Sequence, residues 1–579
     1  MTTTRTIIRR DAADAGLPWP DDALHPVLAR VYRQRGIESP QQLERSLDRL
    51  LPYQLLGGLN EATALLYQAL VEHWRVIVIG DFDADGATST AVAVRALRMM
   101  GAADVDFLVP NRFRFGYGLT PEIVEVAAQR RPQLIITVDN GIASHAGVAA
   151  ANALGIRVLV TDHHLPADTL PAAEAIVNPN LPGDPFPSKH LAGVGVIFYV
   201  MLALRALLRS TGWFAARGLA DPNLAQLLDL VALGTVADVV PLDQNNRILV
   251  GQGLARIRGG QACAGVRALI RIAGRDASRL SAADLGFALG PRLNAAGRLE
   301  DMSLGIACLL CDDEPRALGM AGQLDVLNVE RRRIEQDMKD EALAGLAGLQ
   351  LDDAELPYGL CLYDPAWHQG VIGILASRIK ERFHRPTVVF ANGDDGEIKG
   401  SARSIPGLPI RDVLEAVATR HPGLLSKFGG HSMAAGLTLP VARYDDFCQA
   451  FEHEVRQRLT AADLQPVVHS DGELAPDELT LDLAELLRSA GPWGQGFPEP
   501  TFDGRFEVLE RRVLNERHLK LRVRPQGGGQ ALDALAFNAD ARDLLGGDQP
   551  ALRLAYRLDV NEYRGQRSVQ LIVEHLEAV

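Results

Sequence analysis

Cysteine is scarce in this sequence, with 5 residues in 579, and an odd number in so long a chain does not indicate a disulfide framework. Cys308 and Cys311 form a C-x-x-C motif, but the motif lies in an apolar helical stretch with no second pair nearby. We therefore expect buried structural cysteines there rather than a zinc or redox site. No apolar run approaches the roughly 20 residues that a membrane-spanning helix needs. The first ten residues lack the apolar stretch of a signal peptide, so we expect a cytoplasmic protein.

An excess of positive charge is also missing. The chain has 59 lysine and arginine residues against 72 acidic ones, a formal net charge of −13. A broad nucleic-acid-binding surface would need the opposite sign, because phosphate contacts use Lys and Arg. Basic residues are nevertheless concentrated in two segments, with eight arginines in residues 255–300 and six Lys or Arg in residues 511–524. Any nucleic-acid path is therefore predicted to be local, on an otherwise acidic protein.

The order of hydrophobic patterns predicts an α/β protein of several domains, since 579 residues are too many for one core. Short apolar segments at residues 75–79, 105–109, 134–138 and 156–161 alternate with helical patterns, which predicts a parallel sheet covered on both faces. Residues 191–313 are mostly helical in pattern, with a turn at residues 234–241. A charge-rich helix, a second α/β pattern and a tail of short strands follow.

We divide the chain accordingly into an N-terminal helical extension, a parallel-sheet catalytic domain, a connecting helix, a smaller α/β domain and a C-terminal β-barrel. These parts are predicted at residues 1–50, 51–314, 315–348, 349–462 and 463–579. Barrels with short strands and turns of this kind include oligonucleotide-binding folds, which hold single strands in basic grooves with stacking aromatic residues. In the tail, Tyr556 and Tyr563 are candidate stacking residues, although aromatic residues at strand spacing are more often part of a core.

Three acidic residues, Asp81, Asp83 and Asp85, follow the first predicted strand in the sequence GDFDADG. If the extended conformation continues, their carboxylates point to the same side, and a divalent cation is needed to offset their repulsion. An EF-hand calcium loop is excluded, because position twelve counted from Asp81 is Val92 rather than Glu and the preceding element is a strand. An aspartyl nucleophile of the haloacid-dehalogenase type fits this motif alone, and the motifs that accompany it argue against that alternative.

Further polar motifs follow the third and fourth strands. Asp139 lies in VDNG, and His163 and His164 lie in TDHH. The carboxyl ends of parallel strands converge on a crevice where ligands bind, so these side chains are expected to meet the first acidic motif. A lone Asp at a strand end is usually a helix cap, but three coincident cases exceed that explanation. Asp238 in GTVAD is the candidate fourth contributor, with Asp229 as a weaker alternative.

Carboxylates with one or two imidazoles suit Mn²⁺ or Mg²⁺ better than a structural zinc ion, which prefers thiolates. The predicted set of five carboxylates and two histidines exceeds what one ion needs. A pair of ions roughly 3.5–4 Å apart would use the whole set and is suited to hydrolysis of a phosphodiester by in-line displacement. The sequence therefore predicts a metal-dependent phosphoesterase.

Taken in order, GDFDADG, VDNG, TDHH and GTVAD resemble the four motifs of the DHH phosphoesterase superfamily. The later GGH at residues 429–431 resembles the signature of the DHH-associated second domain, DHHA1. Blocks such as LGFALGPRLNAAGRL and GPWGQGFPEP are similar to the RecJ family within this superfamily. The resemblance implies metal ligation by six residues: Asp81, Asp83, Asp85, Asp139, His163 and Asp238. It also implies a catalytic role for Asp139 and His163, and that His164 contacts the scissile phosphate or acts as a general acid.

The resemblance further implies substrate contacts in the second α/β domain. Residues 400–404 are predicted to form a short loop in which Ser401 and Arg403 hold a terminal 5′-phosphate. Other candidate substrate-binding residues are Arg112, Arg292, Arg298 and His431. Some superfamily members have a histidine ligand just before the first motif, where this chain has Ile79, so the ligand set of the first ion is less complete and Asp81 is expected to compensate.

The function that the resemblance implies is 5′→3′ exonuclease activity on single-stranded DNA, with release of mononucleotides, in recombination and repair. A helicase and a single-strand-binding protein are the expected partners. One alternative is a DHH enzyme for short oligonucleotides, cyclic dinucleotides or pyrophosphate, and the length of the chain disfavours it. A second is a non-catalytic DNA-binding or scaffold protein, which would be expected to have lost part of the acidic set that is complete here.

Overall fold

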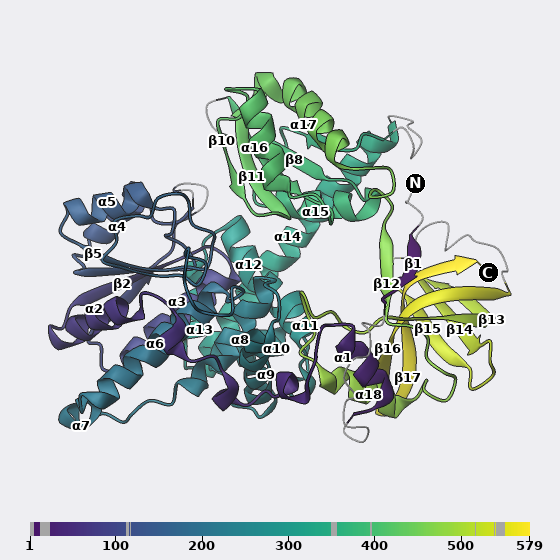
Figure 1. Ribbon diagram of the computed structural model, residues 1–579, viewed down its shortest axis with the longest axis horizontal. Coiled ribbons are helices and arrows are strands. Elements are labelled where there is room, and N and C mark those ends of the chain that lie inside the picture. Colours follow the sequence, from purple (N-terminus) through teal and green to yellow (C-terminus); the bar gives the residue numbers. More distant parts are fainter. Residues whose placement is uncertain are drawn as a thin grey trace. The chain divides into compact units, whose positions relative to one another are not determined.

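The computed structural model divides the chain into two compact units (Figure 1). One unit comprises residues 14–329 and 488–499, and the other comprises residues 1–13, 330–487 and 500–579. The structure describes residues 5–11, 24–111, 115, 117–348, 356–393, 396–515, 517–537, 539 and 550–578. The predicted substrate-binding residue Arg112 lies outside the described residues. Each unit is considered by itself below.

A five-stranded parallel sheet forms the centre of the first unit, in the order β3-β2-β4-β5-β6. The strands are Asp104–Leu108, Arg75–Gly80, Leu134–Val138, Arg157–Thr161 and Ala175–Val177. Every residue of β4 is buried, because helices cover both faces of the sheet. Helices α4 (Pro121–Ala128) and α5 (His145–Ala153) lie on one face, and α2 (Leu59–Val71), α3 (Ala84–Met99) and α6 (Gly193–Ser210) on the other (Figure 1).

The register of this sheet places three polar motifs at one edge. Gly80 at the end of β2 pairs with Val138 at the end of β4, and Val138 pairs with Thr161 at the end of β5. The residues that follow these strand ends therefore leave the sheet side by side. The sequence predicted β2, β4 and β5 to within one residue at each end and missed the short β6.

Helices fill the rest of this unit. Helix α6 is long and apolar enough to cross a membrane, but 67% of it is buried inside the fold, as in a core helix. Helix α8 (Leu228–Ala237) extends to Ala237, so the turn predicted at residues 234–241 begins only at Asp238. The other helices are α1 (Pro26–Arg33), α7 (Trp213–Arg217), α9 (Gln244–Arg258), α10 (Ala264–Ile272), α11 (Ala282–Asp284), the π-helix Leu285–Leu289, α12 (Gly290–Leu299) and α13 (Ser303–Leu310).

The long helix α14 (Glu314–Gly348) corresponds to the predicted connecting helix. Its later residues Met338 and Ala342 pack with α15 (Ile372–Phe383) in a core of the second unit. The α/β part of this unit is a sheet in the order β10-β11-β9-β8-β7, in which only the pairing of β7 with β8 is parallel. Its other elements are β7 (Leu360–Tyr363), β8 (Thr387–Asn392), β9 (Glu397–Arg403), β10 (Lys427–Gly430), β11 (Ala434–Pro440), α16 (Ile410–Arg420) and α17 (Tyr444–Arg458).

Residues 400–404 do not form the predicted loop, whereas the strand that the second α/β pattern predicts at residues 398–402 is present and extends over Glu397–Arg403. Ser401 and Arg403 lie in β9, which pairs with β8 on one side and β11 on the other. Small and polar residues suggest a turn when read locally, but here two neighbouring strands satisfy the backbone of the segment. Both side chains are therefore held by a central strand.

The C-terminal β-rich tail forms the closed barrel β13-β14-β15-β17-β16, as predicted. Its strands are β13 (Phe502–Leu514), β14 (His518–Pro525), β15 (Leu532–Ala536), β16 (Ala551–Tyr563) and β17 (Gln566–Ala578). Tyr556 is fully buried against Phe502 and Phe506, so it belongs to the core and offers no stacking surface. Tyr563 is exposed.

The first fifty residues are less helical than predicted. Residues Thr6–Arg9 form strand β1, which pairs in parallel with β12 (Val467–Ser470). The Arg9 guanidinium donates to the buried carboxylate of Asp503 at 2.8 Å, which ties this strand to the barrel. Helix α1 and short 3₁₀ turns make up most of the remaining described part of the segment.

Candidate metal centre

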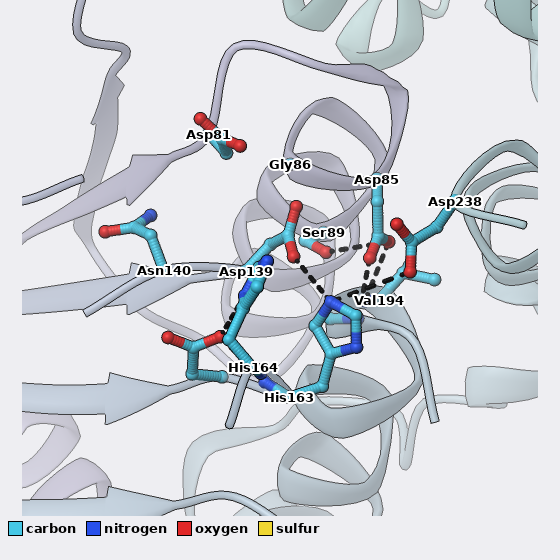
Figure 2. A network of polar contacts seen from close by, with 12 residues as sticks. Asp81, Asp85, Gly86, Ser89, Asp139, Asn140, His163, His164, Val194 and Asp238 are labelled. Carbon is cyan, nitrogen blue, oxygen red and sulfur yellow. Dashed lines mark hydrogen bonds and ion pairs between the residues drawn. The ribbon is translucent and has the colours of Figure 1, made fainter. Parts of the chain in front are cut away.

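Seven side chains from four sequence motifs lie together at the carboxyl edge of the parallel sheet, and Figure 2 labels all of them except Asp83. They form overlapping groups whose potential ligand atoms all lie within 4.8 Å of one another. The groups are Asp81, Asp83 and Asp139; Asp85, His163 and Asp238; and Asp139, His163 and His164. All six predicted metal ligands are therefore brought together, and Asp139 and His163 each belong to two groups.

The way the first motif reaches this cluster differs from the prediction. Helix α3 begins at Ala84, and the Asp83 side chain caps it by accepting from the Gly86 amide at 2.9 Å. The extended conformation therefore ends before Asp85, which lies in the first turn of the helix. As a result Asp81 and Asp85 belong to different ligand groups instead of lining one side of a strand.

Three buried polar atoms at the centre of the cluster indicate that it suits a cation. The His163 Nε2 atom lies 3.1 Å from Asp139 Oδ1 and 3.6 Å from Asp238 Oδ2, and none of these three atoms has a hydrogen-bond partner among the residues that the structure describes. A buried polar atom without a partner is costly unless something else binds it. Carboxylate oxygens with one imidazole nitrogen are donors that suit Mn²⁺ and Mg²⁺. The residues present thus fit the predicted metal.

Burial and mutual repulsion raise the pKa values of Asp85, Asp139 and Asp238 in the metal-free centre. Burial raises the pKa of Asp85 to about 7, and the neighbouring Asp238 adds to the shift. Burial, with Asp83, likewise raises the pKa of Asp238 to about 7, and the pKa of Asp139 lies well above its usual range for similar reasons. Burial lowers the pKa of His163, which keeps the ring neutral and available as a ligand.

This electrostatic arrangement predicts how stability depends on pH without metal. Between about pH 4 and 7 the folded protein holds protons on Asp85 and Asp238 that the unfolded chain has released, so the free energy of unfolding falls as pH rises through this window. We expect the Tm in EDTA to fall between pH 5 and 8, and saturating Mn²⁺ to reverse the fall. An Asp238→Asn variant, whose amide does not titrate, should show a smaller fall in EDTA. A Tm in EDTA that rises steadily to pH 8 would contradict this electrostatic account.

Backbone donors and a close glycine contact fix the position of Asp85 and Asp139. The Asp85 carboxylate accepts from the amides of Gly193 at 2.6 Å and Val194 at 3.0 Å, at the start of α6. A Cβ atom on Gly193 would lie 2.5 Å from Asp139 Cβ, so no larger residue fits there without displacing the ligand. Asp139 itself has a φ of +60°, and its carbonyl accepts from the Tyr117 hydroxyl at 3.2 Å.

Two asparagines that the sequence analysis did not identify also organise the centre. Asn140 donates its side-chain amide to the carbonyls of Ile79 at 3.0 Å and Val138 at 2.9 Å, which links the ends of β2 and β4. Asn294 in α12 accepts from the Ala84 amide at 2.7 Å and so supports the first acidic motif from 210 residues away. Asn140 could have been noticed in VDNG, whereas no local signal marks Asn294.

Asp162 acts on the second histidine instead of joining the ligand groups. Its Oδ1 accepts from the backbone amides of His163 and His164 at 2.8 and 3.1 Å and lies 2.7 Å from His164 Nδ1. Burial of the His164 ring opposes protonation, but the hydrogen bond to Asp162, together with the negative charges of Asp162, Asp238 and Asp81, outweighs it and raises the pKa of His164 to about 9. Asp162 therefore orients this ring and favours its protonated form.

Replacing Asp162 with asparagine tests this positioning role. In metal-free protein we expect the pKa of His164 to fall from about 9 toward the ordinary value of 6.5, because the carboxylate that favours the protonated ring is gone. Activity should fall by about 10- to 100-fold, the usual effect of losing an outer partner of a metal site. NMR titration of ¹³C-labelled histidine in EDTA measures the pKa, with the His25 ring as an internal control. An unchanged His164 pKa in the variant would refute the assignment.

The remaining predicted residues lie in several places. Asp229 is fully buried, accepts from the Cys263 amide at 2.7 Å and lines a separate polar cavity of about 510 Å³ with Arg95 and Arg256. This position favours Asp238 over Asp229 as the candidate ligand from the fourth motif.

Cys308 is buried and Cys311 is partly buried, and both are free thiols.

The candidate substrate-binding residues belong to both units. In α12, Arg292 forms an ion pair with Asp325 at 2.9 Å, and Arg298 is partly buried near the end of the helix. In the second unit, Ser401 and Arg403 lie on β9, and His431 is exposed in the turn between β10 and β11.

A parallel sheet whose strand ends carry clustered aspartates and histidines is the catalytic fold of DHH phosphoesterases, and family models agree with this class. Residues 75–235 match the DHH family N-terminal domain, residues 357–457 match the DHHA1 domain and residues 470–575 match the RecJ OB domain. The single-stranded-DNA-specific exonuclease RecJ of Dickeya dadantii is 60% identical over 578 residues, covering 100% of both chains. RecJ of Escherichia coli is 57% identical over 569 residues, 98% of both chains. The chain belongs to the RecJ family.

Solved structures support the same fold and the nature of the metal. The crystal structure of RecJ in complex with Mn²⁺ from Thermus thermophilus has a TM-score of 0.78 and 33% identity, covering 96% of this chain and 76% of that chain. The Mg²⁺ complex of RecJ from the same organism has a TM-score of 0.73 and 32% identity, covering 96% and 75% of the two chains. The α/β fold class with an oligonucleotide-binding barrel is confirmed, and Mn²⁺ and Mg²⁺ are the ions that were predicted.

Proposed function

We propose that this protein is a metal-dependent exonuclease that hydrolyses single-stranded DNA from its 5′ end and releases 5′-mononucleotides. The observation that carries the proposal is the buried cluster of carboxylates and imidazole, in which three ligand atoms have no hydrogen-bond partner among the described residues. High identity to single-stranded-DNA-specific exonucleases along the whole chain supports the choice of substrate. We place the activity in DNA recombination and repair, in the cytoplasm.

Two ions are proposed to occupy the overlapping ligand groups, one held by Asp81, Asp83 and Asp139 and the other by Asp85, His163 and Asp238. When bound, such ions lower the pKa of a water molecule and offset the charge of the scissile phosphate. The chain itself supplies His164, which we assign to contact that phosphate or to donate a proton to the leaving oxygen. Its hydrogen bond to Asp162 fixes the orientation of the ring and favours its protonated form in the metal-free protein.

Recognition of the 5′ end is assigned to Ser401 and Arg403 on β9. The Arg403 guanidinium donates to Ser401 Oγ at 3.1 Å and to the Ala402 carbonyl at 2.8 Å, and burial lowers its pKa. A Cβ atom on Gly373 would lie 2.9 Å from Arg403 Nη2 and 3.0 Å from Ser401 Oγ, so the first turn of α15 lies against both side chains. A helix N-terminus, a guanidinium and a hydroxyl together suit a terminal phosphate.

Other residues and the C-terminal barrel are proposed to contact the DNA strand. Arg112, Arg292, Arg298 and His431 are assigned to the path of the strand. The barrel is assigned to hold DNA farther along the strand, as oligonucleotide-binding folds do. A helicase and a single-strand-binding protein are proposed as the partners that supply and protect the substrate strand.

Polarity and strand specificity can be tested with one set of oligonucleotides. The same single strand is labelled at its 5′ or 3′ end and incubated with the protein in Mn²⁺, Mg²⁺ or EDTA, beside matched blunt duplexes. We expect immediate release of the 5′ label as a mononucleotide, a ladder of shortened 3′-labelled strands, and no cleavage in EDTA or of the duplex. Release of the 3′ label first would refute the polarity, and no cleavage of any long strand would refute the exonuclease function.

A further inference from the structure

One large apolar side chain lies almost wholly in solvent close to the metal centre. Phe287 is 86% exposed, yet Leu285, Ala288 and Leu289 around it are buried, so the segment that carries the ring is anchored on both sides. The segment is a π-helix, a geometry that occurs mostly as single turns at functional sites. A ring exposed in this way gains none of the free energy of apolar burial, so its side chain is not part of the core of this unit.

The π-helix packs against the end of α8, directly before a candidate metal ligand. A Cβ atom on Gly286 would lie 3.2 Å from Val236 Cγ1, and one on Gly290 would lie 3.1 Å from Ala237 Cβ. Asp238, which belongs to the cluster of ligands, follows Ala237 in the chain. Phe287 therefore projects from a backbone segment that is in contact with the last turn before the metal centre.

A second exposed apolar residue lies on the other side of that ligand. Val239 follows Asp238, is 63% exposed and has a φ of +64°. This left-handed conformation is unfavourable for a β-branched side chain. Glycine would adopt it at no steric cost. Strained residues of this kind persist mainly where the surrounding structure uses them in binding or catalysis.

We infer that Phe287 and Val239 form a platform on which a nucleobase of the bound DNA strand stacks while its phosphate lies in the metal centre. The inference rests on the proposed function and adds a base-binding subsite to it. The small apolar area that Phe287 and Val239 expose supports a single base as the occupant over a protein partner. A stable protein–protein contact instead needs on the order of 1,000 Å² or more. Aromatic stacking also suits a nuclease that acts on many sequences, since every base has a flat face.

Substitutions at Phe287 separate stacking from simple apolar contact. We expect Phe287→Ala and Phe287→Leu each to raise the KM for a single-stranded oligonucleotide by about 5- to 100-fold, which is the range for loss of one stacked base. Phe287→Tyr keeps an aromatic ring, so its KM should stay within about twofold of that of the intact protein. Leu154→Ala, which removes another exposed apolar side chain from the same unit, is the matched control and should change nothing. Equal KM values for the Leu and Tyr variants would overturn the stacking inference.

The role of Val239 can be tested separately from stability. Val239→Gly relieves the positive φ, so its Tm should equal or exceed that of the intact protein. Its KM for the oligonucleotide should nevertheless rise, because the aliphatic part of the platform is lost. A variant with an unchanged KM would remove Val239 from the subsite.

Two further substrates distinguish failure of this inference from failure of the proposed function. An oligonucleotide with abasic residues at its 5′ end keeps the phosphates but offers no base. The intact protein should therefore bind this abasic strand as poorly as Phe287→Ala binds the ordinary strand. Substituting Phe287 should then cause no additional loss. The p-nitrophenyl ester of thymidine 5′-monophosphate reports on phosphodiester hydrolysis itself. If the intact protein cleaves neither this ester nor any oligonucleotide, the proposed function fails. If it cleaves both and Phe287→Ala has an unchanged KM for the oligonucleotide, only the stacking subsite fails.

Discussion

Replacing Asp139 with alanine is expected to lower kcat for single-stranded DNA by about a thousandfold or more. Asp139 belongs to two of the three ligand groups, and its Oδ1 has no hydrogen-bond partner in the described part of the chain. Its loss should weaken the first proposed ion and remove the carboxylate that lies 3.1 Å from His163, a proposed ligand of the second. A catalytic ion contributes several kcal/mol to stabilising charge in the transition state. Initial rates of mononucleotide release at saturating Mn²⁺ measure the effect.

The control for this substitution is Asp104→Ala, which removes a half-exposed carboxylate on β3 that pairs with Arg75 at 2.5 Å. Surface ion pairs of this kind contribute little to stability, so the control should keep its rate and its Tm. Retention of more than a tenth of the activity by Asp139→Ala, with its Tm intact, would mean that the cluster at the sheet edge is not the catalytic centre.

Arg403→Ala is the second substitution with a large expected effect. The guanidinium is proposed to hold the terminal phosphate, and a hydrogen bond to a charged group contributes about 1.5–3 kcal/mol. We therefore expect kcat/KM for a 5′-phosphorylated strand to fall by roughly 10- to 100-fold, whereas kcat/KM for the same strand with a 5′-hydroxyl should change little. Competition between the two substrates in one reaction measures the ratio directly.

Two further variants define this effect. Arg403→Lys keeps the charge but loses the planar fork, so it should recover only part of the preference for a 5′-phosphate. Arg443→Ala, which removes a half-exposed arginine of the same unit that pairs with Asp446, should leave the preference unchanged. If Arg403→Ala slows both substrates equally, Arg403 acts on the strand or on folding and does not read the 5′ end.

The parallel sheet could be predicted from the sequence because its strands are continuous apolar runs. Strands β2, β4 and β5 are buried on both faces, so each reads as a short run of Val, Ile and Leu that ends in a polar motif. Once the strand ends were known, the convergence of Asp81, Asp139 and His163 followed from the geometry of parallel sheets. The positions of these three residues could therefore be predicted from the sequence around each of them.

The features that the sequence missed depend on contacts between distant segments or on competing local interactions. Asp85 turned out to be helical, because the Asp83 side chain caps α3 and ends the extended segment. Ser401 and Arg403 were assigned to a loop, because the pairing of β9 on both sides involves residues far along the chain. Asn294 supports the first motif only through the fold. Nothing in a single sequence marks such partners.

The most direct test of the proposed metal centre is to locate bound Mn²⁺ by anomalous diffraction from crystals of the protein grown or soaked with MnCl₂. We predict two anomalous peaks, one among Asp81, Asp83 and Asp139 and the other among Asp85, His163 and Asp238. Crystals of Asp139→Ala should show a weakened or missing peak in the first group. A single ion, or ions bound only elsewhere on the protein, would contradict the two-ion centre.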